Sequence, residues 1–245
     1  MTGLYVGTSG WNYPEWKEGF YKGVPRRRWL QHYAEVFSGV EVNATFYRSM
    51  KPETLARWRA ETPEHFRYSV KGHRVITHIR RLEEVADSVV EQRAGLAPLA
   101  GRIAVILWQT PAGLTKDLAR LENFARVLED WADVRHVIEF RNRSWFDDES
   151  AACLSRHRLA SAISDASRWP RWDVVTTDLA YVRLHGRPQT YASPYSEEEL
   201  ADWAAKVRRW LGDGHEVHVY FDNTMHGAAP RDASRLLELI GVPYG

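Results

Sequence analysis

Ionisable side chains recur at every second position along several β-rich segments of this 245-residue sequence. In segment 135–142, RHVIEFRN, Glu139 and Arg141 share one strand face, because successive strand side chains point to opposite faces. Segment 180–186, AYVRLHG, likewise places Arg183 and His185 on one face. A parallel strand buried on both sides normally reads as a near-continuous apolar run. The alternation therefore predicts strands whose polar faces gather around a common pocket.

A carboxylate, an imidazole and an amine in one pocket predict proton-transfer chemistry. Glu139 is the leading general acid or base, held in place by Arg141 or Arg183. His185 is the second candidate, because histidine changes charge near neutral pH. Lys71 is expected to act as an electrophile or as a Schiff-base amine. The predicted catalytic set is Glu139, His185, Lys71 and Arg141.

Arginine and aromatic side chains near the predicted strand ends are candidates for binding the substrate. Arginine makes bidentate contacts with carboxylate or phosphate, and aromatic rings stack on sugars or bases. The residues expected in this role are Trp11, Tyr47, Trp145, Arg183, Arg187 and Tyr191. Loops 186–188 and 223–229 lie where barrel enzymes commonly bind phosphate. A small anionic or sugar-like molecule is therefore the expected partner.

The elements that must position these residues alternate between short β-rich runs and longer amphipathic ones. The predicted strands are 4–9, 39–46, 66–72, 102–109, 135–142, 159–165, 180–186 and 216–223. The predicted helices are 26–37, 52–62, 81–96, 115–131, 148–157, 196–211 and 230–240. The Trp- and Pro-rich segment after strand six predicts an irregular connection. Eight such units indicate an α/β fold, a single (β/α)8 TIM-barrel domain over residues 1–245.

The apolar strand faces must meet the surrounding helices, so the polar faces point into the barrel. Burying an unpaired charge lowers the free energy of unfolding by several kcal/mol per ion, on the order of the whole stability of a small protein. A charged barrel interior therefore indicates function. Glu41 and His218 lie nearer the strand starts and are expected to be structural.

Bulk composition excludes several classes of protein. The net charge of +1 provides no general attraction to polyanions, and the single cysteine, Cys153, excludes an intramolecular disulfide. No apolar run approaches the ~18 residues of a membrane helix, and the first residues do not resemble a secretory signal. We therefore expect a cytoplasmic protein without membrane contact and without a cofactor.

Several motifs of the chain resemble the YecE-like family of proteins of unknown function. They are YVGTSGW (5–11), VEVNATFY (40–47), VIEFRNRSW (137–145), YVRLHGR (181–187) and VYFDNT (219–224). The resemblance implies a TIM barrel with a pocket at its C-terminal face, and it implies no particular activity. By position it adds Asn43 and Asn223 to the expected substrate-binding residues, and Asp222 stands where the family often has asparagine.

Two other functions are compatible with the pattern. Glu139, Asp165, His185 and Asp222 lie at the predicted tips of strands five to eight and suit Mn²⁺, Mg²⁺ or Zn²⁺, as in sugar-isomerase or apurinic-endonuclease barrels. Four neighbouring cationic side chains would repel such a metal. A non-catalytic module that binds nucleic acid or a small anion is the other alternative, although the Arg pairs and triplets fit solvated helix faces better. The favoured interpretation is acid–base hydrolysis or isomerisation of a small phosphorylated or carbohydrate-like substrate.

Overall fold

The structure of the protein is a computed structural model. Eight β-strands form its centre. The structure describes residues 3–241, so residues 1–2 and 242–245 of the domain expected over 1–245 lie outside the described residues. All strands pair in parallel, in the order β1-β8-β7-β6-β5-β4-β3-β2. The strands are β1 (Leu4–Thr8), β2 (Gly39–Val42), β3 (Arg67–Lys71), β4 (Ile103–Gln109), β5 (Arg135–Glu139), β6 (Ala160–Asp165), β7 (Leu179–Leu184) and β8 (Glu216–Phe221).

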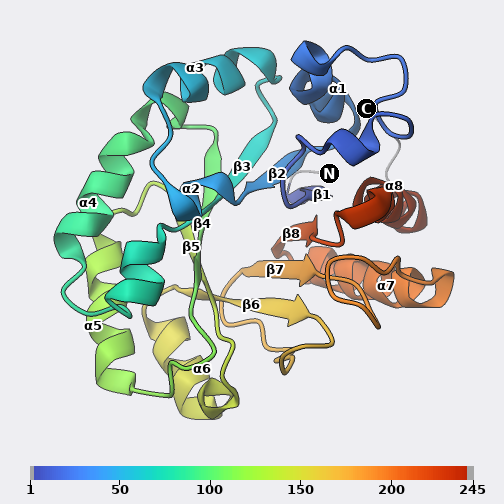
Figure 1. Ribbon diagram of the computed structural model, residues 1–245. Coiled ribbons are helices and arrows are strands. Elements are labelled where there is room, and N and C mark those ends of the chain that lie inside the picture. Colours follow the sequence, from blue (N-terminus) through green and yellow to red (C-terminus); the bar gives the residue numbers. More distant parts are fainter. Residues whose placement is uncertain (1–2, 242–245) are drawn as a thin grey trace.

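Helices surround the strands, as a TIM barrel requires (Figure 1). The α-helices are α1 (Trp29–Val36), α2 (Ala44–Tyr47), α3 (Pro52–Glu61), α4 (Ala86–Gly95), α5 (Leu118–Glu129), α6 (Asp148–Arg156), α7 (Glu197–Gly212) and α8 (Ala228–Ile240). Short 3₁₀ helices are η1 (Pro14–Trp16), η2 (Arg26–Arg28), η4 (Ala97–Leu99), η5 (Arg143–Trp145) and η6 (Met225–Gly227), and η3 (Val75–Ile79) is a π-helix. Side-chain caps begin three of the α-helices. Asp117 accepts from the Arg120 N–H, Asp147 accepts from the Ser150 N–H, and Ser196 forms a capping box with Glu199.

The barrel closes between β1 and β2 through a few contacts rather than a full ladder. Ser9 pairs with Glu41 as an isolated bridge, and the Gly10 N–H donates to the Glu41 carbonyl at 2.8 Å. Closer to the strand starts, the Tyr33 hydroxyl of α1 lies between the two strands and accepts from the Thr8 N–H at 2.7 Å. A Cβ atom at Gly7 would lie 1.9 Å from the Gly39 carbonyl, so only glycine allows this approach.

Two predicted strands end at least three residues earlier than the sequence pattern indicates. The strand expected over 39–46 ends at Val42, and α2 follows, because the Thr45 hydroxyl donates to the Lys71 carbonyl at 2.7 Å and turns the chain across β3. The strand expected over 135–142 ends at Glu139. The irregular connection expected after strand six is confirmed, since residues 166–178 contain no helix.

The buried apolar residues form two clusters. The larger cluster fills the space between the strands and the helices. The smaller cluster fills the lower part of the barrel interior and consists of Val105, Leu107, Val137, Ala160, Ala162, Leu179, Tyr181 and Tyr220. The inward side chains nearer the carboxyl ends of the strands are mostly polar or charged. The prediction that polar strand faces point into the barrel is therefore confirmed for its upper half.

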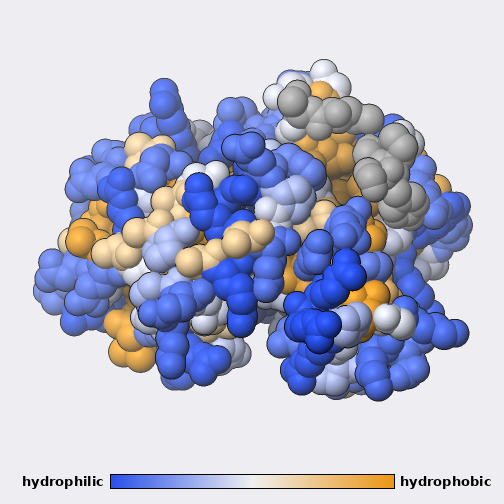
Figure 2. Space-filling model, turned by 90° about the horizontal axis from the view of Figure 1, so that it is seen from above, coloured by the Kyte–Doolittle hydropathy of each residue, from blue (hydrophilic) through white to orange (hydrophobic). Residues whose placement is uncertain are grey.

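The surface carries few exposed large apolar side chains. One face, shown in Figure 2, is mostly hydrophilic, with hydrophobic residues in separate small areas. Among the described residues, no helix has both the length and the apolar character needed to cross a bilayer.

Candidate functional site

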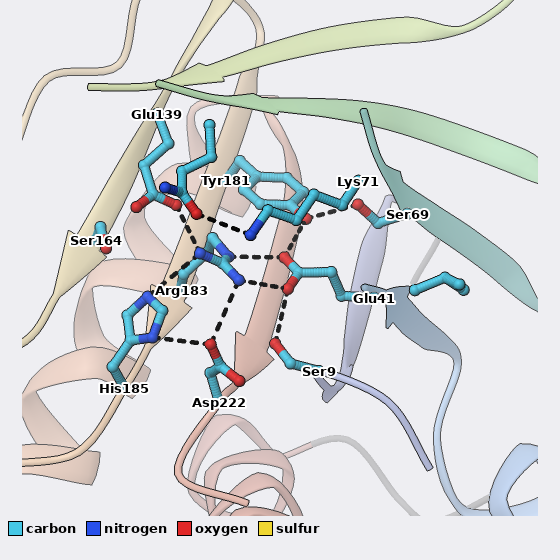
Figure 3. Close-up of polar contacts among 12 residues, drawn as sticks. Ser9, Glu41, Ser69, Lys71, Glu139, Ser164, Tyr181, Arg183, His185 and Asp222 are labelled. Carbon is cyan, nitrogen blue, oxygen red and sulfur yellow. Dashed lines mark hydrogen bonds and ion pairs between the residues drawn. The ribbon is translucent and has the colours of Figure 1, made fainter. Parts of the chain in front are cut away.

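Arg183, on β7, is the centre of a buried ionic network at the upper end of the barrel (Figure 3). Its Nε and Nη2 atoms donate to the two carboxylate oxygens of Glu41 at 2.8 and 2.6 Å. Its Nη1 donates to Glu139 Oε2 at 2.7 Å, and Asp222 Oδ2 lies 3.4 Å from Nη2. The Arg183 side chain is only 1% exposed. Its donors are therefore committed to protein carboxylates rather than to a ligand.

Glu41 belongs to this network, although its position in the sequence predicts a structural residue. The carboxylate is fully buried and also accepts from the Ser9 hydroxyl at 2.7 Å and from the Tyr181 hydroxyl at 2.8 Å. Tyr181 is in turn 2.5 Å from the Ser69 hydroxyl. The inward face of β2 and the motif VEVNATFY (40–47) are the signals for Glu41, and neither indicates its partner Arg183, which lies 142 residues away in the sequence.

Glu139, at the end of β5, is fully buried between two guanidinium groups, those of Arg141 and Arg183. Burial alone would raise the pKa of Glu139, but the charges of Arg141 and Arg183 outweigh it and hold that pKa well below its usual range. The Arg141 guanidinium also lies 3.4 Å from the ring centroid of Trp169. Glu139 is therefore an ionised carboxylate with both oxygens in use.

His185 and Asp222 form a contact at the edge of the network. His185 Nδ1 lies 2.9 Å from Asp222 Oδ2, and His185 is fully buried. Burial and the charge of Arg183 lower the pKa of His185, so its imidazole is neutral near pH 7. Burial would raise the pKa of Asp222, but contact with His185 and the charge of Arg183 lower it. The pair therefore consists of a neutral imidazole and an ionised carboxylate.

Lys71, at the end of β3, is the one cation of this group without a carboxylate partner. Its Nζ donates to the neutral amide oxygen of Gln109 at 2.8 Å and lies 4.4 Å from the ring centroid of Phe46. Among the described residues, no carboxylate oxygen lies within 4.0 Å of this nitrogen. Burial, assisted by the charge of Arg183, lowers the pKa of Lys71 to about 8. About half of Lys71 is therefore an unprotonated amine at pH 8, and about a tenth of it at pH 7.

The other residues expected to bind substrate lie in different surroundings. Arg187 forms an ion pair with Asp165 at 2.8 Å, and Tyr191 lies beside His185 with 5.6 Å between ring centroids. Asn223 is fully buried: its Nδ2 donates to Asp232 at 2.7 Å, whereas its Oδ1 has no hydrogen-bond partner among the described residues.

Asn43 and three aromatic residues complete the expected set. Asn43 follows β2, and its Oδ1 is buried without a hydrogen-bond partner among the described residues. Tyr47 is 69% exposed on α2, and Trp11 packs edge-on against Trp58. Trp145 does not reach the network: it is fully buried and stacks on Phe140, the residue that follows β5.

The four residues of the metal alternative do not converge. Asp165 is held by Arg187, by Arg171 at 3.2 Å and by the Tyr195 hydroxyl at 3.0 Å. Among the four side chains, only those of His185 and Asp222 are in contact with each other. Within residues 3–241, a single group of three His, Cys, Asp or Glu residues places its ligand atoms within 4.8 Å of one another, and it includes none of the four. The donor geometry therefore does not favour a metal centre at the barrel mouth.

The mouth of the barrel is covered on one side and hollowed on the other. Trp169, from the connection after β6, donates to the Ser164 hydroxyl at 2.9 Å and lies edge-on to the His185 ring. On the opposite side, a cleft of about 900 Å³ extends over the ends of β1 and β2. Ser9 lines this cleft and also donates to Glu41, so one hydrogen bond connects the cleft wall with the buried network.

The cleft carries an excess of positive charge. Its charged lining residues are Arg26, Arg27, Arg48, Arg57 and Glu61. Arg26 donates to Asn12, and Arg57 lies 3.8 Å from Glu61. No ion-pair partner of Arg27 or Arg48 occurs among the residues that the structure describes. These two guanidinium groups remain available to an anion.

A family model described as a protein of unknown function, DUF72, matches residues 5–244. The chain belongs to this family. The resemblance to the YecE-like proteins is confirmed, because the chain is also similar to the UPF0759 protein YecE of Escherichia coli (strain K12). YecE is 32% identical over 144 residues, which cover 58% of this chain and 50% of YecE.

Two further similarities extend over the whole DUF72 chain. The UPF0759 protein YunF of Bacillus subtilis (strain 168) is 25% identical over 277 residues, covering 98% of this chain and 96% of YunF. A solved structure of a DUF72 family protein from Thermotoga maritima MSB8 superposes with a TM-score of 0.87 at 26% identity, covering 97% of this chain and 99% of that one. The TIM-barrel fold is thus common to the family, whose description names no activity.

Proposed function

We propose that this DUF72 protein is a proton-transfer enzyme that acts on a small, anionic, carbohydrate-like molecule at the upper end of the barrel. Lys71 is the acid–base group in this proposal. The observation that carries it is the state of Lys71: an amine with a pKa near 8, buried among charges but bonded only to a neutral amide. A base is most effective when its pKa lies near the working pH.

The contacts of Glu139 support this change of role. The sequence favours Glu139 as the leading acid or base, yet Arg141 and Arg183 occupy its carboxylate and depress its pKa. A carboxylate of such low pKa is a weak base and is not protonated at neutral pH. In the proposal, Glu139 positions Arg183 and Arg141, and Lys71 moves the proton.

Isomerisation fits these groups better than glycoside hydrolysis. Cleavage of a glycosidic bond usually needs a carboxylic acid that is protonated near neutral pH. Glu139 and Asp222 both have lowered pKa values, so neither supplies that acid. Isomerisation of a sugar needs a base that removes a proton from the carbon beside the carbonyl and returns it to the carbonyl carbon. The proton of the adjacent hydroxyl passes to the carbonyl oxygen by way of the enediol. The unprotonated Lys71 amine suits the carbon-to-carbon transfer.

The cleft over β1 and β2 supports an anionic substrate. Arg27 and Arg48 line it without a carboxylate partner, and arginine is well suited to phosphate or carboxylate. By contrast Arg183, which the sequence predicts as an anion-binding residue, has its donors occupied by Glu41 and Glu139. The substrate anion is therefore assigned to the cleft rather than to the network.

The first test measures the pKa of Lys71 directly. The chain has six lysines, so reductive methylation with ¹³C-formaldehyde gives at most six side-chain signals in an NMR titration. One signal, absent from the Lys71→Arg variant, is expected to titrate near pH 8, whereas exposed lysines titrate near pH ~10.4. In a Gln109→Leu variant the same signal should shift lower, by about one pH unit, because the ammonium loses its acceptor. An ordinary pKa for Lys71 would remove it from the proposed role.

The second test measures proton transfer. The protein is incubated in D₂O with a panel of aldose and ketose phosphates, and incorporation of deuterium beside the carbonyl is followed by ¹H NMR. Wild type and Lys22→Met, a change at an exposed lysine, should exchange equally, and Lys71→Met should lose at least a hundredfold of the rate. Binding of the same phosphates with no exchange in any variant would favour the small-anion binding module instead.

A further inference from the structure

A second cluster of metal-type ligands lies on the outside of the barrel, between α5 and α6. Glu122 is on α5, Cys153 is on α6, and His157 ends α6 as its C-cap. One ligand atom from each residue lies within 4.8 Å of the other two. These two helices are neighbours in the ring around the barrel (Figure 1). No other group of three such residues within 3–241 meets this condition.

The imidazole of His157 is oriented as a metal ligand would be. Its Nδ1 donates to the Glu129 carboxylate at 2.9 Å, which directs the lone pair of Nε2 away from Glu129. Nε2 lies 3.9 Å from Glu122 Oε1. An outer carboxylate on the far ring nitrogen is the usual arrangement around metal-bound histidine, because it fixes the tautomer and the ring orientation.

We propose that Glu122, Cys153 and His157 bind one divalent cation of the Zn²⁺ class, with Glu129 as a positioning residue. Thiolate, imidazole and carboxylate are the three ligand types of zinc, whereas Mg²⁺ and Ca²⁺ prefer oxygen alone. Tetrahedral zinc requires ligand atoms about 3.3–3.8 Å apart, so the set needs a contraction of at most roughly 1.5 Å. Binding exchanges the thiol proton for the metal, and that proton is released to solvent.

Two exposed arginines provide the positive charge beside Glu122 in the absence of a metal ion. Arg156 Nη2 lies 3.1 Å from Glu122 Oε1, and Arg126 Nη2 lies 3.9 Å from Glu122 Oε2. Their side chains are 63% and 59% exposed, so both can turn into solvent at little cost when a cation binds. The Glu122 carboxylate is therefore available to a metal ion.

The cluster borders a cleft through His157, and it is remote from the proposed catalytic site. A cleft of about 820 Å³, lined in part by Glu129, Arg156 and His157, opens beside it. The same cleft is lined by Arg135, where β5 begins, so it lies at the amino-terminal end of the barrel. Lys71 lies at the opposite end of the strands. A cation here would join α5 to α6 rather than take part in proton transfer.

Cobalt is the probe that tests this site. Cys153 is the only cysteine of the chain, so any thiolate-to-cobalt charge-transfer absorption must come from it. Titration of the intact protein with Co²⁺ near pH 7.5 should produce that absorption, saturating at one equivalent, and Zn²⁺ should abolish it. Absence of the absorption at millimolar Co²⁺ would overturn the proposal.

Variants distinguish specific Co²⁺ binding at this cluster from adventitious Co²⁺ binding elsewhere. His157→Gln should weaken Co²⁺ binding at least a hundredfold, and Glu129→Gln by about tenfold or more, because the outer carboxylate only orients the ring. His32→Gln is the matched control, since His32 also lies near a glutamate, Glu35, at 3.7 Å, and it should change nothing. Arg156→Ala should tighten binding by up to about fivefold. Unchanged binding in His157→Gln, whose ring is 12% exposed and tolerates replacement, would also overturn the proposal.

Discussion

The two halves of the barrel interior are built from opposite kinds of side chain. The lower half is mainly an apolar cluster that includes Val105, Leu107 and Val137, and its buried polar residue His218 is bonded to Glu216 at 3.0 Å. The upper half holds Glu41, Glu139 and Arg183, together with the neighbouring charges. The side chains of these three residues are almost completely shielded from solvent. Both halves use inward positions of the same strands: Leu107 and Gln109 are two residues apart on β4, and Val137 and Glu139 are two apart on β5.

The difference between the two halves indicates that the functional residues lie in the upper half. Apolar packing stabilises the barrel without any requirement for pairing. Buried charges cost several kcal/mol per ion, on the order of half the stability of a small domain, unless each is paired well. The upper half meets that requirement for every group except Lys71, which has only Gln109. An incompletely compensated amine in an otherwise paired network is the feature that stability does not explain.

Removal of Arg183 should give the largest effect on stability. Arg183→Met leaves Glu41 and Glu139 buried without their shared partner, and it should lower the free energy of unfolding by about 3–5 kcal/mol in urea titrations at pH 7. Arg235→Ala is the matched surface control, because Arg235 pairs with Glu197 while 43% exposed; it should cost no more than about 1 kcal/mol. Equal losses in the two variants would mean that the upper half is not desolvated.

Truncation in the lower half should cost somewhat less. Leu107→Ala removes buried apolar volume, and it should reduce the free energy of unfolding by about 2–4 kcal/mol. Because no charge is uncovered, the loss should be the same at pH 6 and pH 9. Ile79→Ala, at a side chain that is 61% exposed, should stay within about 0.5 kcal/mol of wild type. A strongly pH-dependent loss in Leu107→Ala would show that the two halves are coupled.

The smallest of these effects is the pH dependence that Lys71 confers. Below pH 8, Lys71 is protonated in both the folded and the unfolded chain, and the cost of burying its charge is fully present. Between pH about 8 and pH ~10.4 only the unfolded chain keeps the proton, so wild-type stability should rise with pH relative to Lys71→Met. The expected difference between the two urea-unfolding series is on the order of 2 kcal/mol from pH 7 to pH 10. Parallel series would show that the Lys71 pKa is ordinary, and Lys22→Met should parallel wild type.

The positions of the strands and the direction of their side chains were predictable from the sequence. Alternation along β5 and β7 places Glu139, Arg183 and His185 inside the barrel, and all three lie in the network. Alternation does not indicate where a strand ends. The expected strand over 39–46 is too long because a contact with β3, from Thr45 to the Lys71 carbonyl, turns the chain after Val42.

The TIM barrel, the inward polar faces and the identity of most of the charged residues at the upper end can be read from the sequence. These features follow from the two-residue period of a strand and from the order of the elements, which are local properties. The pairing of the charges is visible only in the folded chain: Arg183 pairs with Glu41 and Glu139, and Lys71 pairs with no carboxylate. Pairing sets the pKa of each group, and it depends on barrel closure, which brings β2 and β7 side chains together across 142 residues of chain.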